Sequence, residues 1–146
     1  MFHQSQLTEG EVLVSPHTQG GPFSFTVETM HHAMLADEPH DKGGDDLGPP
    51  PYDFVAMSLA TCTAMTLRLY AKHKGFDLGS VQVKVKAKKR KNTETGEEEL
   101  LLTRSILCAD QCEEERLQKL NEIANKCPVH KSLQGTIAIE TETRQV

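Results

Sequence analysis

The stretch PYDFVAMSLATCTAMTLRLYAKHK, residues 51–74, decides the fold of this chain. Prolines precede it, Asp53 lies in its first turn, and its basic end, KHK, is followed by Gly75. Prolines and acids favour the start of a helix, whereas basic residues and glycine favour its end. The sequence therefore predicts one long helix over 51–74. The uncharged run from Phe54 to Leu67 is typical of a core helix and is too short for a membrane span.

This helix is apolar on nearly all of its faces, which is more than a small monomer readily buries. The chain has 146 residues, a length that suits one domain, residues 1–146. We therefore expect a second copy of the chain to cover part of the helix in a homodimer.

The composition is that of an ordinary globular protein, with 37% hydrophobic and 25% charged residues. The net charge of −5 gives no overall attraction to nucleic acid or to an anionic membrane, and there is no tryptophan to stack on bases. The segment MFHQSQLTEGEVLV lacks the basic and apolar regions of a secretory signal, so we expect a cytoplasmic protein. In that reducing compartment the four cysteines serve packing, redox chemistry or metal binding.

Shorter elements surround the long helix, and each is marked by its own periodicity. In chain order the pattern predicts strands over Glu11–Val14, Phe23–Val27 and about His32–Ala36, a loop over Asp37–Pro51, strands over Val81–Lys89 and Leu100–Leu107, helices over Gln111–Asn125 and Val129–Leu133, and a last strand over Thr136–Thr143. Phe23, Phe25 and Val27 would share the inner face of the first sheet. This order of elements indicates an α+β protein.

The basic run KVKAKKRK, residues 84–91, is interpreted as the solvent-exposed face of a hairpin. Glu97, Glu98 and Glu99 open the following strand and could sit across from these cations. A nucleic-acid patch is the alternative.

Cys127 lies in the motif KCPVH, where Pro128 marks the start of a helical turn. Lys126 is adjacent, and His130 follows three residues later on the same side. A helix start and nearby positive charge lower the pKa of a cysteine and favour the reactive thiolate. Cys127 is therefore a candidate nucleophile, with a small capping residue as the alternative.

The other cysteines have less favourable neighbours. Cys62 lies mid-helix in ATCTAM, where the helix supplies no unpaired donors, so the residues alone favour core filling. Cys108 and Cys112 are interpreted as structural, because the acids after Cys112 disfavour a thiolate. Neither a CxxC pair nor two histidines at ligand spacing occurs, although Cys62, Cys127 and His130 could still converge on a metal.

Two segments together resemble the OsmC/Ohr family of thiol-dependent peroxidases. The first, DEPHDKGGDDLGPPPYDFVAMSLATCTAMTLRLYA, is similar to the family's loop and cysteine-bearing central helix, and the second, IANKCPVHKSL, to its second-cysteine motif. The match covers most of the chain, and the DEP, GG, GP, PY and CPVH pieces are most similar to the broader OsmC-like branch. The resemblance implies an OsmC-like fold, with antiparallel sheets wrapped around long central helices in an intertwined homodimer.

The resemblance also implies a mechanism. Cys62 would attack an organic hydroperoxide and become a sulfenic acid, and Cys127 would condense with it to a disulfide, which a cellular thiol or dithiol reductant reopens. No metal, haem or flavin cofactor is implied. Local electrostatics favours Cys127 as the thiolate, whereas the family assigns the first attack to the position of Cys62, and we follow the family.

The chain departs from the family at the group that activates the attacking cysteine, which is an arginine paired with a glutamate ten residues before that cysteine. Here no arginine precedes Arg68, and the glutamate position holds Tyr52, next to Asp53. In a continuous helix Asp53 lies opposite Cys62 and is expected to act as a cap. Arg68 lies about 120° round from Cys62 and could serve the other subunit. The remaining candidate donors are His31, His32 and His40.

Other functions stay open on the same residues. A redox sensor would oxidise once without turnover, and a binding protein would hold small apolar electrophiles at the same thiols. A metal-binding protein would use Cys62, Cys127 and His130.

Overall fold

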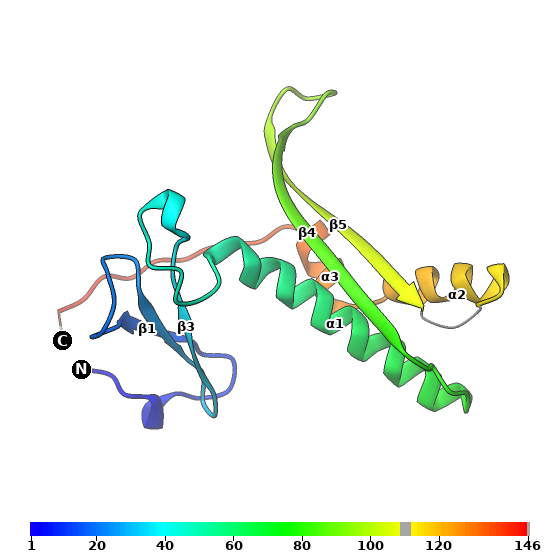
Figure 1. The fold of residues 1–146 in the computed structure, drawn as a ribbon, viewed down its shortest axis with the longest axis horizontal. Coiled ribbons are helices and arrows are strands. Elements are labelled where there is room, and N and C mark those ends of the chain that lie inside the picture. Colours follow the sequence, from blue (N-terminus) through cyan, green and yellow to red (C-terminus); the bar gives the residue numbers. More distant parts are fainter. Residues whose placement is uncertain (109–111, 146) are drawn as a thin grey trace. The chain divides into compact units, whose positions relative to one another are not determined.

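The computed structural model describes residues 1–108 and 112–145 (Figure 1). The chain separates into two compact units, one made of Met1–Phe54 with Glu142–Val146 and the other of Val55–Thr141. Over the described residues, three α-helices and two antiparallel sheets are present. The predicted α+β class is confirmed.

The first unit contains an antiparallel meander of strands β1 (Leu13–Pro16), β2 (Phe25–Glu28) and β3 (Ala33–Ala36). A short 3-10 turn, η1 (Gln4–Gln6), precedes it. In the register Leu13 pairs with Glu28, and Phe25 pairs with Ala36. The meander is confirmed, with its first two strands beginning two residues later than predicted. One sheet face lines an apolar groove of about 580 Å³ with Phe23, Phe25 and Val27, as predicted.

The carboxylate of Asp37 organises the loop between β3 and the long helix. Its Oδ2 accepts a hydrogen bond from Ser24 Oγ at 2.7 Å and bonds from the backbone amides of Asp45 and Leu47 at 3.3 Å. Its Oδ1 accepts from the amide of Glu38 at 2.8 Å. Asp37 itself is buried, so these bonds replace water around its charge. The predicted loop is therefore ordered by a side chain, with one 3-10 turn, η2 (His40–Lys42), inside it.

Helix α1 (Pro51–Lys74) has the bounds that its sequence predicts. Its buried residues, Leu59, Thr63, Leu67 and Ala71, recur every four positions and form one stripe. Met65 is 70% exposed and Leu69 is 53% exposed, so the described residues leave another apolar face uncovered. By length and composition alone the whole of α1 could cross a membrane, although the uncharged run from Phe54 to Leu67 within it is shorter than a span requires. The core helices of soluble proteins pass the same test.

A long hairpin of β4 (Val81–Lys91) and β5 (Glu98–Cys108) crosses α1 within the second unit (Figure 1). Its inner row packs with Val83 and Ile106 against a core centred on Leu67. The predicted strands are confirmed, each longer than expected.

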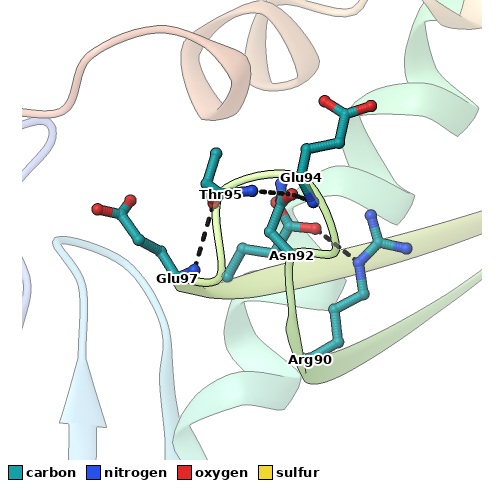
Figure 2. A network of polar contacts seen from close by, with 6 residues as sticks. Arg90, Asn92, Glu94, Thr95 and Glu97 are labelled. Atoms are coloured by element: carbon teal, nitrogen blue, oxygen red, sulfur yellow. Dashed lines mark hydrogen bonds and ion pairs between the residues drawn. The ribbon is translucent and has the colours of Figure 1, made fainter.

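The turn of this hairpin is held by a polar network (Figure 2). Asn92 Oδ1 accepts hydrogen bonds from the amides of Glu94 and Thr95 at 2.8 and 3.1 Å. Arg90 pairs with Glu99 across the strands at 2.6 Å. Acids therefore face cations at this end of the hairpin, whereas Lys84, Lys86 and Lys88 lie opposite Ser105, Thr103 and Leu101.

Two short helices close the second unit. Helix α2 (Glu114–Ala124) places Leu120 and Ile123 in the core with Leu67, Ala71 and Leu78, and α3 (Pro128–Gln134) follows. Both helices were predicted. The described part of α2 begins at Glu114, and Gln111, the predicted first residue, lies outside the described residues.

The predicted last strand over Thr136–Thr143 is wrong for this chain, because these residues carry no regular secondary structure. Ile137 and Ile139 are 61% and 86% exposed. An alternating pattern becomes a strand only where a neighbouring strand pairs with it, and among residues 1–108 and 112–145 no strand pairs with this segment.

Candidate active site

The structure brings Cys62 and Cys127 together within the second unit. Cys62 lies on α1 and is partly exposed, whereas Cys127 immediately precedes α3 and is fully buried. Their side chains share a hydrogen bond, in which the thiol of Cys62 donates to the sulfur of Cys127. All four cysteines of the chain are thiols. Two sulfurs that are distant in the sequence therefore lie in direct contact.

The chain turns sharply to deliver Cys127 to this point. Helix α2 ends at Ala124, and the amides of Lys126 and Cys127 then bond to the carbonyls of Ile123 and Ala124 at 3.0 and 3.2 Å. Pro128 starts the next helix because its fixed backbone suits the first helical position. Cys127 is left as the N-cap of α3, and its Sγ accepts a hydrogen bond from the amide of His130 at 3.4 Å.

The surroundings of Cys127 favour its ionised form. Burial alone would raise the pKa of Cys127, but hydrogen bonds from the Cys62 thiol, from the amides of His130 and Val129, and from the Thr63 hydroxyl outweigh burial and lower the pKa. This direction agrees with the sequence-based expectation for the KCPVH motif.

The surroundings of Cys62 favour its neutral form. Burial raises the pKa of Cys62, and its donated hydrogen bond to Cys127 and the charge on that sulfur raise it further. The Val129 amide acts in the opposite direction without reversing the shift. Of the two sulfurs, Cys62 is therefore the one that holds its proton more tightly, and Cys127 is the one that ionises more readily.

Sequence reasoning missed two residues beside this pair, Thr63 and Arg104. Arg104 Nη1 donates to Thr63 Oγ1 at 3.0 Å and to the carbonyl of Ala124 at 3.1 Å, and Nη2 donates to Asn125 Oδ1 at 2.7 Å. A signal for Arg104 exists in the sequence, since it is the one charge in the inward row Leu100, Leu102, Arg104 and Ile106. An inward cation on an otherwise apolar strand face indicates a buried acceptor.

Of the predicted supporting residues, Tyr52 and Asp53 belong to the first unit, whereas Arg68 and His130 belong to the unit that holds the two sulfurs. Asp53 lies in the first turn of α1, where an acid stabilises the helix start. Tyr52 and Arg68 are exposed on the same helix. His130 contributes its backbone amide, while its side chain lines a separate cavity of about 340 Å³ with Leu59 and Leu102.

The histidines that were candidates for the missing donor lie in the first unit. His31, His32 and His40 are exposed, and His40 Nδ1 bonds to the carbonyl of Gly44 at 3.1 Å. Within the described residues no group of three or more His, Cys, Asp or Glu side chains is placed to hold a metal ion. A metal site made of Cys62, Cys127 and His130 therefore has no support in the geometry.

The remaining cysteines lie elsewhere in the second unit. Cys108 ends β5 and packs against the core cluster, and Cys112 is partly buried before α2. The structural role predicted for Cys108 agrees with this packing.

Solved structures of similar fold come from several bacteria. The organic hydroperoxide resistance protein OsmC of Legionella pneumophila superposes with a TM-score of 0.64 at 18% identity, covering 88% of this chain and 92% of that chain. An OsmC-like protein of Mycoplasma pneumoniae gives 0.64 at 20% identity, covering 88% and 89%. The organic hydroperoxide resistance protein OhrB of Bacillus subtilis gives 0.62 at 19% identity, covering 86% and 90%.

No curated protein matches the sequence. A family profile described as OsmC-like protein matches residues 43–142, which include both Cys62 and Cys127 and more than half of the chain. Together with the shared α+β architecture, this match gives the assignment: the chain belongs to the OsmC-like protein family.

Proposed function

We propose that the protein is a thiol-dependent peroxidase that reduces organic hydroperoxides to alcohols through Cys62 and Cys127. The observation that carries the proposal is the contact between the two sulfurs, one partly exposed and one buried. Membership in the OsmC-like family adds support, as do structural neighbours named for organic hydroperoxide resistance.

The first chemical step starts from the cysteine pair with a single proton, which is on Cys62. The proton passes from Cys62 to Cys127, and the Cys62 thiolate attacks the terminal oxygen of ROOH. A lone pair of the sulfur forms the S–O bond, the electron pair of the O–O bond leaves with the alkoxide, and the alkoxide takes the proton from Cys127 to become ROH. Cys62 is then a sulfenic acid, and Cys127 is again a thiolate.

The second step joins the two sulfurs. The Cys127 thiolate attacks the sulfur of the sulfenic acid, so that an S–S bond forms and hydroxide leaves. A cellular thiol or dithiol reductant then reopens the bond by exchange and returns both thiols. These steps need no cofactor.

Partners and location belong to the same proposal. The exposed apolar face of α1, with Met65 and Leu69, supports a homodimer in which a second copy covers this helix. Thiol chemistry that is recycled by a reductant suits the cytoplasm. A small apolar hydroperoxide is the substrate class that a site on an apolar helix favours.

Steady-state assays separate a peroxidase from its alternatives. With cumene hydroperoxide and excess dithiol, we expect sustained peroxide consumption by the wild-type protein and none by Cys62→Ser. Cys127→Ser should permit one oxidation and then stop, because no second sulfur forms the disulfide. Cys112→Ser is the matched control and should keep turnover. A single oxidation by the wild-type protein would instead support the redox sensor, and no oxidation at all would support a binding protein.

A further inference from the structure

Arg104 holds together three parts of the second unit near the cysteine pair. Its guanidinium donates to Thr63 on α1, to the last carbonyl of α2 at Ala124, and to the side chain of Asn125 in the turn before Cys127. The three distances lie between 2.7 and 3.1 Å. Arginine remains charged at all relevant pH values. Its bond to Thr63 therefore places a permanent positive charge beside a residue that itself bonds to the sulfur of Cys127.

Thr63 differs from the other hydroxyl residues of α1. Ser58, Thr61 and Thr66 turn back and donate to carbonyls of their own helix at 2.7 to 2.8 Å. The Thr63 hydroxyl is fully buried, accepts from Arg104 and bonds to the sulfur of Cys127. An arginine can only donate, so the single proton of the Thr63 hydroxyl is left for Cys127.

We propose that Arg104 and Thr63 form a relay that keeps the negative charge of the cysteine pair on Cys127, so that this sulfur is ready to condense with a sulfenic acid on Cys62. Arg104 is a positioning residue in this scheme, because it acts through Thr63. The charged and titratable groups around Cys127 are Cys62 on α1, Arg104 on β5, and Lys126 and His130 in its own segment. The condensation of Cys127 with a sulfenic acid rests on the proposed peroxidase function, whereas the location of the negative charge on Cys127 does not depend on it.

The relay acts on the second step of the reaction. The Cys127 thiolate attacks the Cys62 sulfenic sulfur, the S–S bond forms, and hydroxide leaves with the electrons of the S–O bond. Lowering the pKa of a thiol has two opposing effects on its reaction rate: the thiolate becomes less nucleophilic, but a larger fraction of the thiol is ionised. The second effect is the larger one as long as the thiol would otherwise be mostly protonated. The relay should therefore speed disulfide formation, while it disfavours the proton transfer from Cys62 to Cys127 that precedes the first attack.

The first test needs no peroxide and measures thiolate absorbance in the ultraviolet as a function of pH. Thr63→Val keeps the shape of the side chain and removes its donor, so the titration of the pair should move to higher pH. Thr63→Ser keeps the hydroxyl and should titrate as the wild type does. Cys108 and Cys112 contribute alike to every variant, so a change reports on Cys62 and Cys127.

Matched controls lie on the same elements. Thr61→Val makes the same change two residues away, on an exposed hydroxyl that bonds only within α1, and should leave the titration unchanged. Arg104→Met should move the titration in the same direction as Thr63→Val, whereas Arg90→Met, in the same hairpin, should not. Superimposable titrations of wild type, Thr63→Val and Arg104→Met, all folded by circular dichroism, would overturn the relay.

The second test follows one equivalent of cumene hydroperoxide in the presence of dimedone, which traps sulfenic acid. Losing a hydrogen bond to a charged group should slow disulfide formation about tenfold in Thr63→Val, with a matching rise in dimedone adduct on Cys62. Thr63→Ser should restore the wild-type ratio of disulfide to adduct. An unchanged ratio in Thr63→Val would overturn the relay. If no variant forms either product while the titration still shifts, the charge assignment stands and the peroxidase proposal fails.

Discussion

The thiol of Cys62, in the middle of α1, donates a hydrogen bond to the sulfur of Cys127, the residue that precedes α3. A hairpin and a helix separate the two positions in the chain, so the contact is a product of the fold rather than of local sequence. Burial of Cys127 leaves Cys62 as the sulfur that a solute reaches first. The pair thus combines a partly exposed thiol with a buried one whose pKa is lowered.

The buried carboxylate of Asp37 should make stability depend on pH in acid. Burial raises the pKa of Asp37, but hydrogen bonds from Ser24 and from the amides of Glu38, Leu47 and Asp45 lower it below the ordinary value of 3.8. The stabilisation is therefore complete above this value and is lost as the pH falls through the folded pKa. Urea unfolding across this range should show a steeper loss for the wild type than for Asp37→Asn. Asp41→Asn, on an exposed residue, should follow the wild type; equal slopes for all three proteins would contradict the assignment.

Leu67 should carry much of the stability of the second unit. It is fully buried in the core with Leu120 and Ile123, so Leu67→Ala leaves a cavity and should lower the free energy of unfolding by about 3 kcal/mol. Leu107→Ala removes the same atoms from a side chain that is 45% exposed on β5, and should cost less than about 1 kcal/mol. Similar losses for both variants in urea titrations would show that the core lies elsewhere.

The exposed face of α1 should be the dimer interface. A charge placed there would be buried without a partner, so Met65→Asp and Leu69→Asp should each convert the dimer to a monomer in multi-angle light scattering. Lys72→Glu, on an exposed polar position of the same helix, should remain dimeric. A monomeric wild type, or dimers in both Asp variants, would remove this interface from the proposal.

The prediction of one domain over residues 1–146 has a direct test in the two tyrosines. Tyr52 lies in the first unit and Tyr70 in the second, and α1 runs through both. A shared helix couples the units, so Tyr70→Phe and Tyr52→Phe, each with one remaining tyrosine, should give coincident unfolding curves by fluorescence. Two separate midpoints would indicate two domains.

The helices and hairpin could be predicted because their signals are local. Prolines, charges and Gly75 mark the ends of α1, and strict alternation marks β4. The strand expected over Thr136–Thr143 failed because pairing requires a neighbour, which alternation does not supply.

The site was predictable only in part for the same reason. Cys127 carries its own local signal in KCPVH, and the structure agrees with it. Thr63 and Arg104 meet only after the hairpin folds over α1, 41 residues apart in sequence. The single arginine in the inward row of β5 was the available signal in the sequence, and it does not predict which residue the arginine contacts.

Mass spectrometry of the wild-type protein after one equivalent of cumene hydroperoxide, without reductant, tests the central claim most directly. The account predicts a single intramolecular disulfide that joins the peptides containing Cys62 and Cys127, with Cys108 and Cys112 still reduced. A bridge that includes Cys108 or Cys112, or oxidation of Cys62 that never proceeds to a bond with Cys127, would contradict it.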